Sequence, residues 1–258
     1  MPRSTKPALA DPPTGPDTAS GGPGTARPTP EKQQMYEQFA GVVKAFASPL
    51  RLMLLDLLEQ AERSVEALAT VAGASTANTS AQLQVLADAG LVRRRRDGNR
   101  MLYRLADPEV GGLVTALMAV AEHRSASARE AAARYLGDTD QLRTITAAEL
   151  EAGLADGSIL LLDVRPFDEY AAGHIGGARH VDATRLAESV QELLPTLDAQ
   201  PTTAQIVAYC RGPYCAFAPQ ALRALSRHGH SGALLPDGTS GWARSGRPVD
   251  QLSPAPTR

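Results

Sequence analysis

Two cysteines occur in the 258-residue chain, and both lie in one short segment, QIVAYCRGPYCAFAPQALRAL, as Cys210 and Cys215. The apolar run before Cys210 is typical of a buried strand, and the segment after Cys215 is typical of a helix. Backbone N–H groups of a tight loop and the N-terminus of the next helix favour thiolate over thiol, and Arg211 adds a positive charge. We therefore predict that Cys210 is a nucleophile able to accept another sulfur atom, in a loop completed by Gly212, Pro213, Tyr214 and Cys215.

Other interpretations of the two cysteines stay open. They could be small buried hydrophobic residues. Cys215 could line the wall of the loop, or it could resolve a persulfide on Cys210 by forming an internal disulfide or polysulfide. The N-terminus lacks the apolar core of a signal peptide, so we expect a cytoplasmic protein. In that reducing compartment, redox chemistry, catalysis or metal binding is favoured over a structural disulfide.

The composition limits the classes of protein to consider. A chain of this length is long enough for two ordinary domains. Hydrophobic residues make up 43% of the chain but aromatic residues only 4%, which favours helices rich in Ala and Leu over an all-β sandwich. The formal net charge is -2, so any nucleic-acid footprint must be local. The longest apolar runs, such as ILLL at 159–162, are too short to cross a membrane.

Helical and strand-like segments alternate from residue 146 onward. A capping box at Thr146 and Glu149 opens the first helix, and SILLLDV, QIVAY and GALL are the strand-like runs. Buried strands between helices predict a parallel sheet covered on both faces, with its chemistry beyond the carboxyl ends of the strands. Cys210, directly after QIVAY, occupies such a position.

Three segments, LLDVRPFDEYAAGHIGGARHV, YCRGPYCAFA and GWARSGRPV, resemble the signature regions of a single-domain rhodanese across about 146–250. The resemblance implies that Cys210 takes a sulfane sulfur from thiosulfate or a low-molecular-weight persulfide and passes it to a thiol or cyanide. It also implies a polar frame for the loop from Asp163, Arg165, Glu169 and His174. The chain departs from the family at PDGTSGW, where a more apolar Gly-Gly turn is usual.

Related phosphatases and arsenate reductases need an arginine six residues after the cysteine, where it holds an oxyanion bidentately. This chain has Ala216 at that position. The substitution argues against both of those activities.

The N-terminal half has a different organisation. Residues 1–30 are rich in Pro, Gly, Thr and Ala without apolar periodicity, which predicts a disordered tail. After an amphipathic helical segment and LRLMLLDLLEQ, Ser64 can cap a helix that ends at Gly73, and Ser75 can cap the next, which ends at Gly90. Two short helices around a Gly-containing turn predict a helix-turn-helix.

A basic hairpin follows. LVRRRR and RMLYRL are strand-like runs joined by Asp97-Gly98-Asn99, a strong hairpin signal. A charge run is often only a solvated face. Beside a helix-turn-helix, however, it predicts a basic wing that attracts DNA phosphates, with Arg93, Arg94, Arg95, Arg96 and Arg100 as the contacting residues.

The stretch from ASPLRLMLLDLLEQ to YRLADPEV is identified as a member of the ArsR family of bacterial winged-helix repressors, over roughly 32–136. The resemblance implies that the helix before the wing enters the major groove and that the first and last helices form a homodimer. Helical phase places Thr79, Leu83 and Leu86 inward. The outward residues are the candidate base readers: Thr76, Ala77, Ser80, Ala81 and Gln84.

The sequence departs from the metal-sensing founders of that family, which carry thiolates in the helix matching SVEALATVAG. This segment has no cysteine, which excludes a thiolate arsenic site there. Glu122 beside His123 does not supply four ligands and is interpreted as a solvated pair. We predict neither a metal nor a cofactor.

The last helix of the first domain begins with Asp107 as cap and Pro108 as first residue, and we expect it to end near Leu136. The predicted domains are a tail at 1–30, a winged-helix DNA-binding and dimerisation domain at 31–137, a linker at 138–145, a rhodanese domain at 146–250 and a tail at 251–258. The fold class is therefore multidomain: a mainly α winged helix-turn-helix followed by an α/β parallel-sheet domain.

The leading hypothesis is a homodimeric transcriptional repressor that binds an inverted-repeat operator in double-stranded DNA, without membrane contact. Its rhodanese domain would bind, transfer or sense reactive sulfur. The alternative is a sulfurtransferase that the DNA-binding module only places or regulates. A third hypothesis keeps the rhodanese fold only as an interaction module; the intact CRGPYC loop argues against it.

Overall fold

The computed structural model describes residues 27–199 and 204–252. Most of the predicted tail at 1–30 and of the tail at 251–258 lies outside the described residues. The chain divides into two compact units, residues 1–40 and residues 41–258. The helix α1 (Pro30–Lys44) crosses that boundary.

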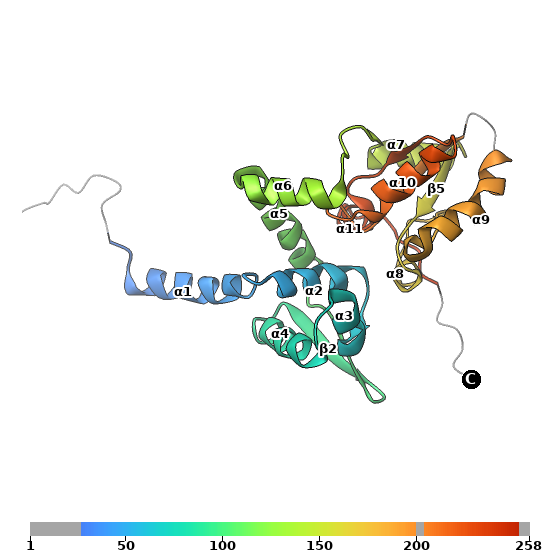
Figure 1. The fold of residues 1–258 in the computed structure, drawn as a ribbon. Helices are drawn as coiled ribbons and strands as arrows, with labels where there is room; N and C mark the ends of the chain where they lie inside the picture. Colours follow the sequence, from blue (N-terminus) through green and yellow to red (C-terminus); the bar gives the residue numbers. More distant parts are fainter. Residues whose placement is uncertain (1–26, 200–203, 253–258) are drawn as a thin grey trace, which may run out of the picture. The chain divides into compact units, whose positions relative to one another are not determined.

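The winged helix-turn-helix is built from short elements with local start and stop signals (Figure 1). Ser64 accepts a hydrogen bond from the N–H of Ala67, and Ser75 accepts one from Asn78, so both predicted caps are confirmed. Gly73 ends its helix with φ at 63°, a left-handed conformation that favours glycine. The elements are α2 (Pro49–Gln60), β1 (Arg63–Ser64), α3 (Val65–Ala72), α4 (Thr76–Asp88), β2 (Val92–Asp97) and β3 (Arg100–Leu105).

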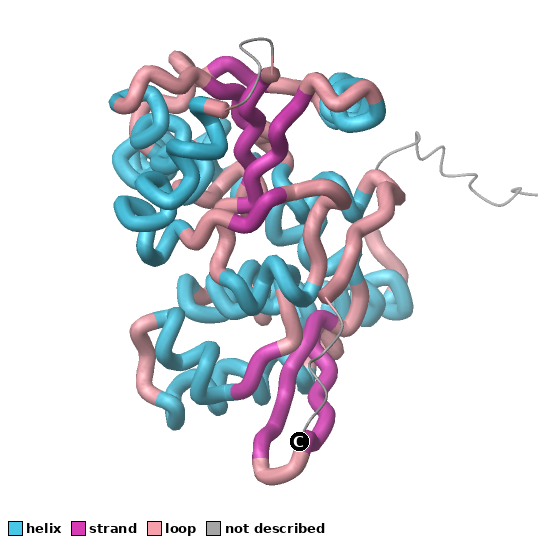
Figure 2. The backbone as a smooth tube through the Cα atoms, turned by 90° about the vertical axis from the view of Figure 1, so that its right-hand side faces the viewer, coloured by secondary structure: helices cyan, strands magenta, loops and turns pink. Residues whose placement is uncertain are grey.

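The three strands form an antiparallel sheet in the order β1-β3-β2. Asp97 pairs with Arg100, so the turn of the hairpin consists of Gly98 and Asn99, and Gly98 has a φ of 57°. The β2–β3 hairpin projects beyond the helices around it (Figure 2). The domain core forms where α2, α3, α4 and the wing meet, around fully buried leucines: Leu54, Leu55, Leu68, Leu83 and Leu86.

The predicted last helix of this domain is wrong in one respect. Asp107 caps α5 (Pro108–Arg124) with Pro108 at its first position, as expected, but the helix ends at Arg124. Ser125 has an extended backbone and caps a separate helix, α6 (Ala126–Leu136), through the N–H of Ala128. Ser125 therefore ends one helix and starts the next, because its hydroxyl satisfies an N–H that an unbroken helix would pair internally.

The second half forms a parallel sheet of five strands in the order β4-β8-β7-β5-β6. The predicted capping box of Thr146 and Glu149 is present at the start of α7. Its elements are β4 (Arg143–Thr144), α7 (Ala147–Ala155), β5 (Ile159–Asp163), α8 (Phe167–Ala172), β6 (Arg179–His180), η1 (Ala183–Arg185), α9 (Leu186–Asp198), β7 (Gln205–Tyr209), α10 (Phe217–Arg227), β8 (Gly232–Leu234) and α11 (Gly238–Arg244).

Alternation along the two central strands builds one core on each face of this sheet. Leu162 and Ala208 pack with residues of α9 and α10, whereas Leu161 and Val207 pack with residues of α7 and α11. Both faces are covered, as the apolar strand sequences predict. The segment 138–145, predicted as a linker, includes β4 of this sheet.

Candidate functional site

The loop from Cys210 to Cys215 joins the carboxyl end of β7 to the start of α10. Both cysteines are free thiols, Cys210 is 2% exposed and Cys215 is 7% exposed. The Cys210 Sγ lies 3.3 Å from the carbonyl oxygen of Cys215. The structure therefore places the predicted loop residues together at the expected edge of the sheet.

The first turn of α11 holds the backbone of this loop. The N–H of Thr239 donates to the Cys210 carbonyl at 3.0 Å, and the N–H of Ser240 donates to the Arg211 carbonyl at 3.0 Å. Gly238 has a φ of 54°, and a Cβ there would lie 2.3 Å from the Cys210 oxygen. The segment PDGTSGW, which departs from the usual family sequence, thus makes close backbone contact with the nucleophile loop.

The two thiols differ in acidity. Burial raises the pKa of the Cys210 thiol well above its ordinary value, in spite of the N–H groups of Ala218 and Arg211. A hydrogen bond with the Cys210 side chain, together with the N–H groups of Arg211 and Phe217, lowers the pKa of Cys215. The loop N–H groups of Ala218 and Arg211 thus favour a thiolate on Cys210, as expected, and burial of the sulfur opposes it.

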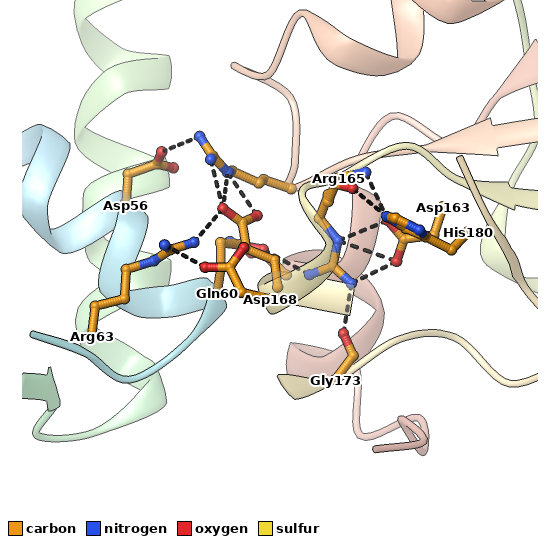
Figure 3. Close-up of polar contacts among 11 residues, drawn as sticks. Asp56, Gln60, Arg63, Asp163, Arg165, Asp168, Gly173 and His180 are labelled. Carbon is orange, nitrogen blue, oxygen red and sulfur yellow. Dashed lines mark hydrogen bonds and ion pairs between the residues drawn. The ribbon is translucent and has the colours of Figure 1, made fainter. Parts of the chain in front are cut away.

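Arg211 forms ion pairs with carboxylates, so its positive charge is not a free cation beside the sulfur atoms. Its Nε and Nη2 donate to Glu169 at 2.9 and 2.6 Å, and its Nη1 lies 3.9 Å from Asp56 on α2. Glu169 is fully buried, and it also accepts a hydrogen bond from Arg63 at 2.8 Å. Arg63, in β1 of the winged helix, pairs with Asp168 at 2.5 Å as well (Figure 3).

A second buried arginine joins the same two domains. Arg165 forms a bidentate pair with Asp163, with Nη2–Oδ2 at 2.6 Å, and donates to the carbonyl of Gly173 at 2.6 Å. Its Nη1 donates to Gln60 Oε1 at 3.2 Å (Figure 3). Gln60 Nε2 in turn donates to Ser240 Oγ at 2.9 Å. The end of α2 is thus hydrogen-bonded both to the polar frame of the loop and to the turn that holds the loop.

The polar frame predicted from the rhodanese resemblance is present in part. Glu169 contacts the loop through Arg211, and Asp163 fixes Arg165. His174 instead lies with its Nδ1 2.9 Å from the carbonyl oxygen of Tyr170, which can accept a hydrogen bond from it, and the backbone of His174 pairs with Asp250. The contribution of Asp56, Gln60 and Arg63 was not predicted, since no local pattern pairs residues more than 100 positions apart.

The prediction that Glu122, on α5, belongs to a solvated pair with His123 is wrong. The hydroxyl of Tyr214 donates to Glu122 Oε2 at 2.8 Å, so the carboxylate is not part of a solvated pair. Burial, followed by this hydrogen bond, raises the pKa of Tyr214 to about 12. His123 does remain exposed, with Nδ1 at the carbonyl of Ala119. Among the described residues, no cluster of His, Cys, Asp and Glu could hold a metal ion.

The candidate base readers lie on one exposed face of α4. Thr76, Ala77, Ser80, Ala81 and Gln84 are exposed, whereas Thr79, Leu83 and Leu86 are buried, as helical phase predicts. The first residues lie at the N-terminal end of the helix that precedes the wing. The exposed face therefore presents small and polar side chains to solvent, and Gln84 on it also donates to Asp88 at 2.6 Å.

The wing arginines Arg93, Arg94, Arg95, Arg96 and Arg100 are all exposed. Arg94 Nη1 donates to Gln84 Oε1 at 3.2 Å, which connects the wing to the exposed face of α4. Arg95 is engaged by Glu62 at 2.5 Å. The wing and α4 thus present one polar surface with excess positive charge.

Sequence comparisons agree with both halves of this structure. The profile of a helix-turn-helix domain matches residues 46–95, and that of a rhodanese-like domain matches residues 146–245. The HTH-type transcriptional regulator Rv0324 of Mycobacterium tuberculosis is 42% identical over 223 residues, which cover 86% of this chain and 95% of that protein. The chain belongs to the ArsR-type helix-turn-helix transcriptional regulators. It is a DNA-binding regulator that carries a rhodanese-like domain.

Shorter relatives match the first half alone. A probable mercury resistance operon repressor of Streptomyces lividans is 35% identical over 98 residues, covering 38% of this chain and 78% of that protein. A solved structure of the homodimeric winged helix-turn-helix domain of Mb0332 from Mycobacterium bovis is 41% identical and covers 40% of this chain and 95% of its own, with a TM-score of 0.36. No helix in residues 27–199 or 204–252 is long and apolar enough to span a bilayer.

Proposed function

We propose that this regulator is a homodimeric repressor whose affinity for an inverted-repeat operator falls when the Cys210–Cys215 loop reacts with sulfane sulfur. The observation that carries the proposal is the sharing of one buried carboxylate, Glu169, by Arg211 of the loop and Arg63 of the winged helix. Among the described residues, Glu169 is the only hydrogen-bond acceptor that both arginines share. A change in the loop that displaces Arg211 would therefore also change the surroundings of Arg63.

Arg63 is well placed to pass such a change to the DNA-binding elements. It lies in β1, where it pairs with Tyr103 of the wing strand β3, and it immediately precedes Ser64, the cap of α3. The α3 helix packs against α4, which presents the candidate base readers. Movement of Arg63 would therefore shift the wing (β2 and β3) and α4 relative to each other.

The DNA-binding role of individual residues is supported by exposure and charge. Ser80 and Gln84 can hydrogen-bond base edges, and Ala77 permits close approach, while exposed wing arginines attract phosphates without sequence preference. A homodimer is supported by α5, on which Leu113, Leu117 and Val120 are 46%, 39% and 62% exposed. Apolar side chains in a row on one helix favour contact with a second copy.

The size of the required effect favours a covalent change of the loop over a single added atom. Converting a mostly bound population to a mostly free one needs a differential free energy of about 5 kcal/mol. A Cys210–Cys215 crosslink would rebuild the loop that carries Arg211, whereas one added sulfur would reorganise only part of it. The crosslink is therefore the stronger trigger.

The test titrates operator DNA with wild type, Cys210→Ser and Cys215→Ser, each before and after treatment with a low-molecular-weight persulfide. Wild-type affinity should fall on treatment, and neither variant should respond if the crosslink is the trigger. An unchanged wild-type affinity would reject sensing. A response retained in Cys215→Ser would reject the crosslink and leave persulfidation of Cys210.

The second candidate function is a sulfurtransferase, favoured by two reduced thiols in a loop at the carboxyl ends of the parallel strands. Purified protein should then transfer sulfur from thiosulfate or a persulfide to cyanide or a thiol, with Cys210 as catalytic residue and Arg211 holding the loop. Cys210→Ser should abolish turnover while Cys215→Ser retains some. An inactive wild type would exclude the enzyme.

A further inference from the structure

A cavity of about 540 Å³ lies where the winged helix meets the rhodanese domain. One side is formed by the end of α2 and by the segment from Arg104 to Pro108, which joins β3 to α5. The other side is formed by Arg165, the end of α8, the α11 helix and the segment after it. This volume is typical of small-molecule sites, which often lie between domains. Residues 210–215 contribute nothing to the lining, so the cavity is separate from the cysteine loop.

Most of the cavity wall is apolar. Its largest apolar side chains are Leu58, Leu105 and Val249. The other apolar residues of the wall are smaller, namely Ala61, Ala106, Pro108, Ala172 and Ala243. An aliphatic group is stabilised against such a wall because its apolar surface is removed from water.

Three buried polar side chains interrupt this apolar wall. Gln60 and Ser240 are 8% and 9% exposed, and Arg165 is fully buried. Arginine can only donate hydrogen bonds, so the atom of Gln60 that lies 3.2 Å from Arg165 Nη1 must be the amide oxygen (Figure 3). The amide nitrogen of Gln60 therefore faces Ser240 Oγ, 2.9 Å away.

This group has more hydrogen-bond donors than acceptors. Arg165 uses Nε and Nη2 for Asp163 and for the carbonyl of Gly173, and it uses one of the two N–H bonds of Nη1 for Gln60. Gln60 Nε2 keeps a second N–H, and the hydroxyl of Ser240 keeps its O–H. Among the described residues, no acceptor engages these three remaining donors. The oxygen atoms of an anionic ligand would satisfy them.

The charges of the lining also favour an anion. The carboxylate of Glu59 is paired with Arg244, and that of Glu62 is paired with Arg95. Arg104 is exposed, and within the part of the chain that the structure describes no hydrogen bond or ion pair engages its side chain. The lining therefore carries a positive charge without a partner, which attracts anions.

We propose that this cavity is a binding site for a small aliphatic carboxylate. The ligand carboxylate accepts hydrogen bonds from Gln60, Arg165 and Ser240, and the hydrocarbon chain packs against the apolar wall. Because the walls belong to different domains, the ligand contacts both of them. The site uses neither cysteine, so it gives the regulator a second ligand that does not depend on the proposed sulfur chemistry.

Calorimetric titration of the full chain with hexanoate tests the class of ligand. Hexanamide keeps the hydrocarbon chain but lacks the charge, and acetate keeps the charge but lacks four methylene groups. Both should bind at least about tenfold more weakly than hexanoate. Absence of hexanoate binding at millimolar concentration overturns the proposal, and so does hexanamide binding as tight as that of hexanoate.

Two substitutions test the place of binding. Ala243 is exposed on α11 and lines the cavity, so Ala243→Trp should fill apolar space without disturbing the core, and hexanoate binding should be lost. Arg104→Ala should weaken binding several-fold. The matched control is Ala187→Trp, at an exposed alanine of α9 that does not line the cavity, and it should bind hexanoate as wild type does. Wild-type affinity in Ala243→Trp, or an equal loss in Ala187→Trp, overturns the site.

Hydrogen exchange of the unsubstituted protein locates the ligand without any risk of a folding defect. Backbone amides at the end of α2 and in α11 should exchange more slowly with hexanoate than without it, whereas those of α9 should not change. Slower exchange confined to other elements would place the ligand elsewhere and overturn the site. Cys210→Ser should bind hexanoate as wild type does, so a failure of the proposed sulfur response leaves this test intact; loss of binding in Cys210→Ser would overturn the independence of the site from the cysteine loop.

Discussion

Arginines occur in two regions of this chain with opposite surroundings. In the wing, Arg93, Arg94, Arg96 and Arg100 are exposed, and no salt bridge engages them among the described residues. Between the domains, the side chains of Arg63, Arg165 and Arg211 are 7%, 1% and 14% exposed and are held by Asp163, Asp168 and Glu169. The same side chain is therefore open to solvent in one region and paired with carboxylates of the protein in the other.

The difference shows how burial decides what a positive charge can do. An exposed guanidinium keeps its hydration and interacts weakly with any single neighbour, but several together attract phosphates over a distance. A buried guanidinium has lost its hydration, so it depends on its carboxylate partners for stability. Loss of one wing arginine should therefore leave the fold intact, whereas loss of the fully buried Glu169 should destabilise it.

The largest expected effect is on stability. Glu169→Ala removes the acceptor shared by Arg63 and Arg211 and leaves two buried charges without it, which should cost about 3–5 kcal/mol of the free energy of unfolding. Chemical denaturation measures the loss. As the matched control, Glu188→Ala removes an exposed partner of Arg185 and should change stability by less than about 0.5 kcal/mol. Similar losses in both variants would contradict the comparison.

The two regions also differ in how far the sequence could predict them. The caps at Ser64, Ser75, Asp107 and Thr146 were predicted because a cap depends on residues two or three positions away. The exposed face of α4 followed from helical phase. The hydrogen bond between Arg63 and Glu169 joins residues 106 positions apart, and nothing local distinguishes Arg63 from a solvated arginine.

The cysteine loop illustrates the same limit. Its position after a buried strand and before a helix was predictable from apolar runs. The burial of Cys210 depends on α9, α10 and α11, whose packing is a property of the whole sheet, and this burial raises the pKa of the Cys210 thiol. Sequence patterns thus placed the loop but did not show how deeply Cys210 is buried.

The next largest effect concerns DNA affinity. Arg94→Ala or Arg96→Ala should weaken operator binding by roughly 1 kcal/mol and lower the salt dependence by about one released counterion, because each removes one phosphate contact. Binding titrations over a range of salt concentrations measure both quantities. Arg134→Ala, an exposed arginine on α6, is the control and should change neither. A salt dependence that stays the same in both wing variants would exclude phosphate contact by these residues.

A smaller effect should come from freeing an arginine already in the wing. The Nε and Nη2 of Arg95 donate hydrogen bonds to the carboxylate of Glu62 at 2.5–2.9 Å. Glu62→Gln removes the competing negative charge, so operator affinity should increase by about 0.5 kcal/mol at low salt and by less at high salt. Weaker binding by this variant would show that Glu62 positions Arg95 for DNA instead of competing with it.

The smallest effect tests Asp56, a carboxylate of the interface that stays partly in water. Asp56 lies 3.9 Å from Arg211, and its side chain is 39% exposed. Burial raises its pKa from the ordinary 3.8 to about 6; Arg211 opposes this change, while Glu59 and Glu169 add to it. A pKa that is higher in the folded state means that the folded protein binds the proton more tightly than the unfolded chain does.

The stability that Asp56 contributes is therefore complete below its unfolded pKa of 3.8 and is lost as the pH rises through about 6. Asp56→Asn keeps the shape of the side chain and cannot ionise, so the free energy of unfolding of this variant should fall less between those two pH values than that of wild type. Because water screens a side chain of this exposure, the difference should be about 0.5 kcal/mol or less. Denaturation of both proteins across that range measures it. A wild type that gains stability relative to Asp56→Asn as the pH rises would mean that Arg211, and not burial, controls this carboxylate.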